Sequence, residues 1–202
     1  TQSDVDIHST DLIAADFNGD GRLDLAVTSL GFNFERGSIR LFFATQAGTF
    51  EPAGVYEPDN SFLSVRVADL NGDRSPDLIV TYTHALVSSD GSADSFLSGV
   101  GVLLNSGGGR FGPMVSYWPG RDTQNAELGD FAGDGFPEIV ATAFDEGVVS
   151  VLRNVALPGG TARIQNAPLA ATGVTLDVVP GREVSAAVAS LRDANSLSTA
   201  AD

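Results

Sequence analysis

An acidic segment that occurs three times limits how this chain can fold more than any other feature of its sequence. Its copies are Ala15–Leu25, Ala68–Leu78 and Gly129–Ile139, and their first aspartates are Asp16, Asp69 and Asp130. These aspartates are 53 and 61 residues apart (69 − 16 and 130 − 69). Self-similarity at a period of about 50 residues is typical of chains that repeat one supersecondary unit, such as propellers.

Strand-like segments surround each acidic copy in the same order. An apolar run follows it, then a run that begins with glycine, and two repeats continue into a Gly-x-Phe turn and a further strand; another candidate strand precedes the motif. The apolar runs are 25–28, 78–82 and 139–142, and the Gly-led runs are 37–43, 99–105 and 147–154. The Gly-x-Phe turns are 48–50 and 109–111, and the strand before the second motif is 63–68. Four short strands per repeat predict an all-β fold made of β-propeller blades, each of four antiparallel strands, with about three recognisable blades.

The predicted organisation has two parts. Residues 1–155 hold the three repeats, with motifs at 16–24, 69–77 and 130–138, and residues 156–202 form a less regular β segment. Within it, 173–179 reads as a strand and 185–195 as a strand or a short helix. Asp202 resembles the first residue of a further motif; the alternative is a coincidental Ala-rich segment. Propellers close with about four to eight blades, so we expect a piece of a longer array, a ring completed by oligomerisation, or a cryptic fourth blade.

A polar loop is expected over residues 83–98, where it either binds a ligand or is merely mobile.

The acidic loops are expected to hold Ca²⁺, a hard cation that takes six to eight oxygen ligands. Ligands at alternate loop positions converge on one centre, and the seventh position contributes a backbone carbonyl, which makes no demand on its side chain. Glycines at the fourth position, Gly19 and Gly72, permit the turn. The predicted ligands are Asp16, Asn18, Asp20, the carbonyl of Arg22 and Asp24 in the first loop, and Asp69, Asn71, Asp73, the carbonyl of Ser75 and Asp77 in the second.

The third loop is degraded, because Ala132 replaces the third-position ligand and a glutamate replaces the last aspartate. Its predicted ligands are Asp130, Asp134, the carbonyl of Phe136 and Glu138, and we expect it to be the weakest site or to hold no ion. An EF-hand is excluded, since it needs a bidentate Glu at position 12 and flanking helices, whereas that position holds Val27, Val80 and Ala141 between strand-like segments. The alternative is an Asx-rich turn without metal.

Composition narrows the possible partners. The chain of 202 residues has 26 acidic and 11 basic residues, a formal charge of −15, and no cysteine. This balance disfavours nucleic acid and anionic lipid surfaces, which reward basic patches, and fits cation binding; three bound Ca²⁺ would change −15 to −9. Cysteine chemistry is excluded, and no segment has the roughly 20 apolar residues that a membrane-spanning helix needs.

The motifs and the strands around them, over roughly residues 10–155, resemble FG-GAP/VCBS repeats, the blades of integrin-α-like β-propellers. The resemblance rests on the Ala-Asp-[Phe/Leu]-Asn-Gly-Asp core, the Gly-led strand that ends in Asn105 or Asn154, and the Gly-x-Phe turn. It implies an extracellular, cell-surface or periplasmic calcium-binding module. It also implies that the calcium loops lie between blade strands on one face and that protein or glycan partners bind elsewhere.

The function expected is therefore binding, adhesion or scaffolding, with calcium serving the structure. No catalytic motif is found around His8 or His84, so we expect a non-enzymatic chain. The alternative is the propeller portion, catalytic or not, of a polysaccharide-degrading lyase or hydrolase. Trp118, the single tryptophan, is expected to pack in a blade core; the alternative is an exposed ring that serves as a stacking platform for a sugar ligand. The sequence leaves open the ligand, the blade number and any regulation by calcium.

Overall fold

The computed structural model describes residues 8–31, 37–56, 60–87, 93–145, 147–157 and 161–168, and every regular element in this part of the chain is a β-strand. The strands are β1 (Ser9–Ala15), β2 (Asp24–Ser29), β3 (Ile39–Ala44), β4 (Phe50–Tyr56), β5 (Ser61–Ala68), β6 (Asp77–Val87), β7 (Ala93–Leu103), β8 (Val115–Tyr117), β9 (Thr123–Gly129), β10 (Glu138–Ala143), β11 (Val148–Leu157) and β12 (Thr161–Pro168). None of the described residues belongs to a helix long and apolar enough to cross a membrane.

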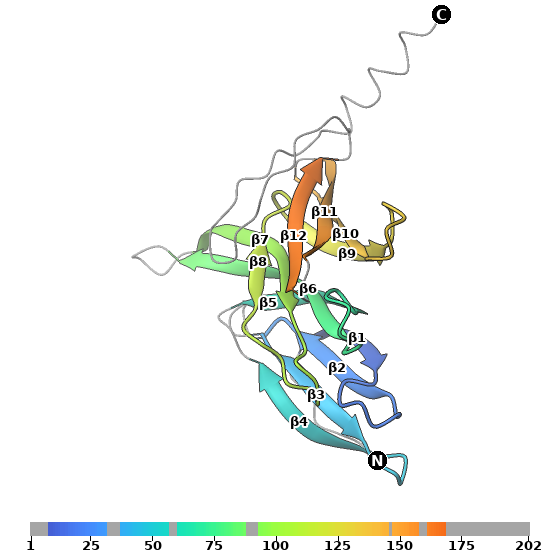
Figure 1. Cartoon of the computed structure of the whole chain (residues 1–202). Helices are drawn as coiled ribbons and strands as arrows, with labels where there is room; N and C mark the ends of the chain where they lie inside the picture. Colours follow the sequence, from blue (N-terminus) through green and yellow to red (C-terminus); the bar gives the residue numbers. More distant parts are fainter. Residues whose placement is uncertain are drawn as a thin grey trace, which may run out of the picture.

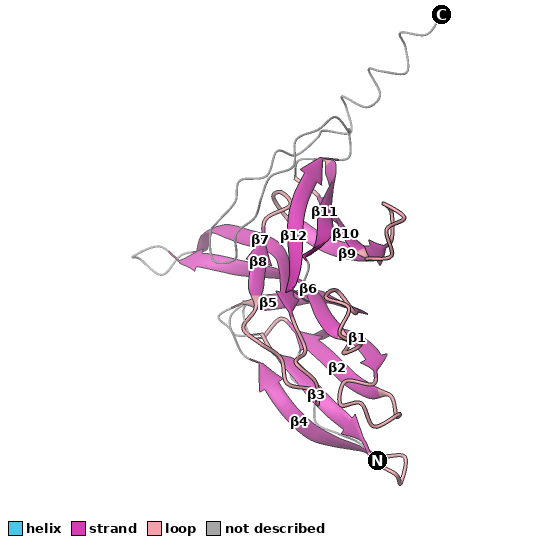
Figure 2. Ribbon diagram, in the orientation of Figure 1, coloured by secondary structure: helices cyan, strands magenta, loops and turns pink. Residues whose placement is uncertain are grey.

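The strands form three four-stranded sheets, in the orders β1-β2-β3-β4, β5-β6-β7-β8 and β9-β10-β11-β12. Neighbouring strands within each sheet are antiparallel and consecutive in sequence. Each sheet is therefore a meander, and Figures 1 and 2 show the three as successive blade-like layers. This confirms the predicted all-β fold of propeller-like blades, and we call the sheets blade one, blade two and blade three.

Two apolar cores lie between successive blades, because strand side chains alternate between the two faces of a sheet. We call the face turned toward the following blade the leading face and the opposite one the trailing face. The first core joins the leading face of blade one, Phe17, Ala26, Ile39 and Leu41, to the trailing face of blade two, Phe62, Val65, Leu78, Val80 and Leu103. The second joins the leading face of blade two, Leu70, Ile79, Val100 and Val102, to the trailing face of blade three, Ala126, Ile139, Ala141 and Leu152.

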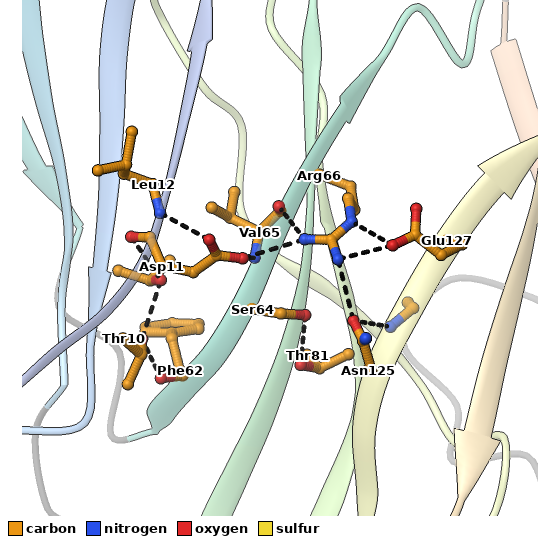
Figure 3. Close-up of polar contacts among 12 residues, drawn as sticks. Thr10, Asp11, Leu12, Phe62, Ser64, Val65, Arg66, Thr81, Asn125 and Glu127 are labelled. Carbon is orange, nitrogen blue, oxygen red and sulfur yellow. Dashed lines mark hydrogen bonds and ion pairs between the residues drawn. The ribbon is translucent and has the colours of Figure 1, made fainter.

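Polar contacts also link the first strands of the three blades (Figure 3). Arg66 on β5 donates from Nη1 to Asp11 Oδ2 on β1 at 3.0 Å and from Nη2 to Glu127 Oε1 on β9 at 2.7 Å. Its Nη2 also donates to Asn125 Oδ1 at 3.1 Å. The carboxylate of Glu127 holds the pKa of Arg66 above its ordinary value, and Arg66 in turn lowers the pKa of Glu127. One guanidinium thus joins all three blades.

Two boundaries differ from the sequence prediction. The segment 83–98 is not simply a loop, since β6 and β7 pair onward from His84↔Leu97 to Val87↔Ala93 as a long hairpin. Backbone pairing between adjacent strands propagates even through polar residues. Blade three also continues past residue 155, because β12 pairs with β11. The strand expected at 173–179, the element at 185–195 and the further motif at Asp202 lie outside the described residues.

Candidate calcium loops

The three acidic motifs occupy the same place in each blade, the connection between its first and second strands. The fourth loop residue is a glycine with positive φ in every copy: 78° at Gly19, 77° at Gly72 and 71° at Gly133. The sixth position also has positive φ, 84° at Gly21 and 90° at Gly135. The loops therefore share one backbone conformation, including the third loop, which the sequence marked as degraded.

Arg74 occupies the sixth position of the second loop with a φ of 68°. A side chain is disfavoured in this left-handed region, where glycine is the usual residue. The backbone N–H of Arg74 nevertheless donates to Asp69 Oδ2 at 2.8 Å. The loop scaffold thus imposes the conformation on a residue that does not prefer it.

The first aspartate of each loop organises the turn by accepting backbone N–H groups. Asp16 Oδ1 accepts from Gly19 at 2.8 Å and from Asp20 at 3.0 Å, and its Oδ2 accepts from Gly21 at 2.8 Å. The same pattern recurs at Asp69, with donors Gly72, Asp73 and Arg74 at 2.7, 3.1 and 2.8 Å. Asp130 accepts from Asp134 and Gly135, both at 3.0 Å. The Asx-turn chemistry weighed as an alternative is therefore present.

The acid at the ninth position is buried in all three loops, at 0% exposure for Asp24 and Asp77 and 1% for Glu138. Asp24 Oδ2 accepts from the N–H of Phe17 at 3.1 Å, and its Oδ1 accepts from Ala44 at the end of β3 at 2.8 Å. Each such acid ties the start of its loop to the sheet, and the two aspartates also bind the end of the third strand.

In the second loop, Asp77 accepts from the N–H groups of Leu70 and Asn105, each at 2.8 Å. Burial raises the pKa of Asp77 to about 6, against the lowering effect of these two hydrogen bonds. In the third loop Glu138 Oε2 accepts from Phe131 at 2.7 Å and from Ala132 at 3.2 Å. The longer glutamate thus takes over the contact that aspartate makes to the loop start.

The third and fifth positions differ between the loops. Asn18 Nδ2 donates to Asp20 Oδ2 at 2.9 Å, and the guanidinium of Arg22 pairs with the same oxygen. In the second loop the corresponding amide of Asn71 donates to Asp73 Oδ2 at 2.9 Å. There the seventh residue is Ser75, so no cation from that position competes for the carboxylate.

The donor chemistry of the first two loops fits a calcium ion. Carboxylate and amide oxygens are the ligands that Ca²⁺ prefers, and an oxygen that accepts one N–H retains a second lone pair. In the part of the chain that the structure describes, however, no three or more His, Cys, Asp or Glu side chains are gathered as a metal-holding group. The predicted ligands are brought onto one loop, but they are not arranged as a coordination sphere. The calcium assignment stays a prediction.

An amide contact between blades that occurs twice in this chain emerges only from the structure. Asn105, just after β7 in blade two, donates from Nδ2 to the carbonyl of Phe17 in the first loop at 2.9 Å. Asn154 of blade three donates likewise to Leu70 in the second loop at 2.7 Å. Both side chains are buried. We call this contact the asparagine latch; the recurrence of Asn after the Gly-led apolar runs was its only sequence signal.

The positions of the other candidate residues, Trp118, His8 and His84, do not decide their roles. Trp118 is half-buried, which favours neither a sugar platform nor full core packing. His8 is exposed, with its Nδ1 3.1 Å from the carbonyl oxygen of Gly31, and His84 is half-buried. The absence of catalysis is not tested by this arrangement and stays a prediction.

Fold and loops together define a protein of β-propeller-like blades with an acidic turn in each. A family model described as an FG-GAP-like repeat matches residues 16–80, which run from the first acidic loop into β6. This match agrees with the FG-GAP resemblance over blade one and the start of blade two. No curated protein matches the chain significantly.

Proposed function

We propose that this chain is a calcium-binding β-propeller repeat module of an exported or cell-surface protein, acting in binding or adhesion or as a scaffold. The observation that carries the proposal is the turn that the three loops share, with positive φ at the fourth and sixth positions and a first aspartate that accepts N–H groups of the turn. This acidic turn is repeated between the first and second strands of each blade, although Ala132 leaves the third turn without a side-chain oxygen at its third position.

In this proposal calcium serves the fold. The acids of one loop repel each other, and a bound divalent cation neutralises them. Asp16, Asn18, Asp20 and Asp24 would hold the ion in the first loop, with the carbonyl of Arg22, and Asp69, Asn71, Asp73 and Asp77 in the second, with the carbonyl of Ser75. Binding to the folded state alone stabilises it by about 2.7 kcal/mol when free calcium is 100-fold above the dissociation constant. Extracellular calcium modules work with dissociation constants of about 10⁻⁴–10⁻³ M, which suits an exported protein.

The two complete loops are expected to differ in affinity. Arg22 pairs with Asp20 in the first loop, and an ion there must compete with this guanidinium. The second loop has Ser75 at that position and keeps Asp73 free of that competitor. We therefore expect the second loop to bind more tightly than the first, and the third loop to bind most weakly because Ala132 supplies no side-chain ligand.

Calorimetric titration of chelator-treated protein with Ca²⁺, together with thermal unfolding of the same samples, tests the proposal. We expect about two equivalents to bind, and the second loop to fill first. Saturation should raise the melting temperature by roughly 5–10 °C per site, since 1 kcal/mol corresponds to about 2–4 °C in a domain of this size. Asp69→Asn should remove one equivalent, while Glu51→Gln, an exposed acid on β4, should remove none. No heat and no thermal shift at millimolar Ca²⁺ would refute the metal assignment.

A further inference from the structure

The two cores between blades use the same four positions of the leading face. These positions are Phe17, Ala26, Ile39 and Leu41 in blade one, Leu70, Ile79, Val100 and Val102 in blade two, and Phe131, Val140, Val149 and Val151 in blade three. In blades one and two all of them are at most 9% exposed. In blade three Phe131 is 63% exposed and the three valines are half-buried. Among the residues that the structure describes, none covers this apolar face of blade three as fully as the next blade covers the faces of blades one and two.

The trailing face of blade one lies at the other end of the three described blades. Leu12 and Leu25 correspond by strand register to Val65 and Leu78, which are 0% and 1% exposed against blade one. Leu12 is 61% exposed and Leu25 half-buried, although Val27 and Phe42 on the same face are already buried. Within the described part of the chain, the leading face of blade three and the trailing face of blade one are therefore only partly covered.

We propose that the leading face of blade three is a docking site for the trailing face of blade one in a second copy of this chain. The argument is continuity with the interfaces inside the chain, where a leading face twice receives a trailing face of the same residue types. Such a contact is head to tail, and it closes into a ring if the rotation permits. The three described blades of each copy would together give six, within the range of about four to eight at which propellers close.

One feature of blade one makes this contact weaker than the internal ones. The latch position, Asn105 in blade two and Asn154 in blade three, is Ala44 in blade one. The carbonyl of Phe131 corresponds to the latch acceptors of the first two loops, and a second copy would bring no amide to it. The wild-type association should accordingly be reversible, with a dissociation constant in the micromolar range or above. Ala44→Asn should tighten it about 10-fold, the effect of one hydrogen bond of about 1.4 kcal/mol.

Sedimentation velocity over a concentration series, with and without Ca²⁺, tests the docking. Wild type should associate, and Ala44→Asn should do so at about 10-fold lower concentration. Leu12→Gln and Phe131→Gln should each weaken association at least 10-fold, whereas Leu97→Gln, an exposed leucine of the middle blade, should not. Mixing the Leu12→Gln and Phe131→Gln proteins should restore one heterodimer, since each keeps the face that the other has lost.

Two results would overturn the docking proposal. Wild type and Ala44→Asn that both remain monomeric at every concentration would show that a second copy does not occupy these faces, leaving them to other blades or partners. Association that each single variant abolishes but that their mixture does not restore would show a contact other than head to tail. Calcium binding is read separately by calorimetry, so failure of the docking does not touch the proposed function.

Discussion

Removal of one asparagine latch, by Asn105→Ala, offers the sharpest test of how the blades are held together. The side chain is fully buried and makes three contacts: its Nδ2 donates to Phe17 O at 2.9 Å and to Pro76 O at 3.2 Å, and its Oδ1 accepts from Gly107 N at 3.0 Å. Alanine at this position is compatible with the strand, because Ala44 occupies it in blade one.

The cost of this substitution follows from which groups lose their partners. Phe17 O keeps the N–H of Gly109 at 2.7 Å, and half-buried Gly107 can turn to water. The carbonyl of half-buried Pro76 also loses the amide, and each of the hydrogen bonds lost with the buried side chain costs about 0.5–1.5 kcal/mol. We expect Asn105→Ala to lower the free energy of unfolding by about 2–3 kcal/mol. Asn154→Ala should cost less, about 1 kcal/mol, because its Oδ1 has no hydrogen-bond partner and only the bond to Leu70 is lost.

Urea unfolding at saturating Ca²⁺, followed by the fluorescence of Trp118, measures both losses. The slope of free energy against urea should not change, because the surface exposed on unfolding is unaltered. Gln46→Ala, which removes an exposed amide from a turn, is the control and should cost at most about 0.5 kcal/mol. A cost for Asn105→Ala that equals this control, or that is smaller than the cost of Asn154→Ala, would refute the reasoning.

Two further substitutions test the loop backbone and the ionic contact between blades. Arg74→Gly should stabilise the protein by about 0.5–1 kcal/mol in thermal or urea unfolding, since glycine relieves the φ of 68° and keeps the N–H that Asp69 accepts; a loss of stability would contradict the assignment of strain. Arg66→Leu should cost only about 1 kcal/mol, because Glu127 is 65% exposed and solvent screens the pair. The pKa of Glu127 is lowered from its ordinary 4.5, so its share of this stability is fully present above pH 4.5 and disappears as the pH falls through the lowered value. A difference between Arg66→Leu and wild type that grows in acid would contradict this account.

The sequence by itself determined the local structure. The turn glycines Gly19, Gly72 and Gly133 and the first aspartates act on atoms within five residues of themselves, so their pattern predicted the loops and the strands that follow. The same locality explains why the third loop keeps its backbone. Ala132 removes a side-chain oxygen, whereas the turn depends on Asp130 and the glycines, which remain.

Only the tertiary structure decided how the blades meet. Asn105 reaches a carbonyl 88 residues away, and Arg66 joins residues 55 and 61 positions distant. Nothing in the sequence near these residues specifies their partners, because the partners are set by strand register and by which face of one sheet packs on the next. For the same reason Phe17 and Leu70 are buried while Phe131, in the same place of its own motif, is exposed. The motif fixes the turn, and the neighbouring blade determines whether the side chain beside it is covered.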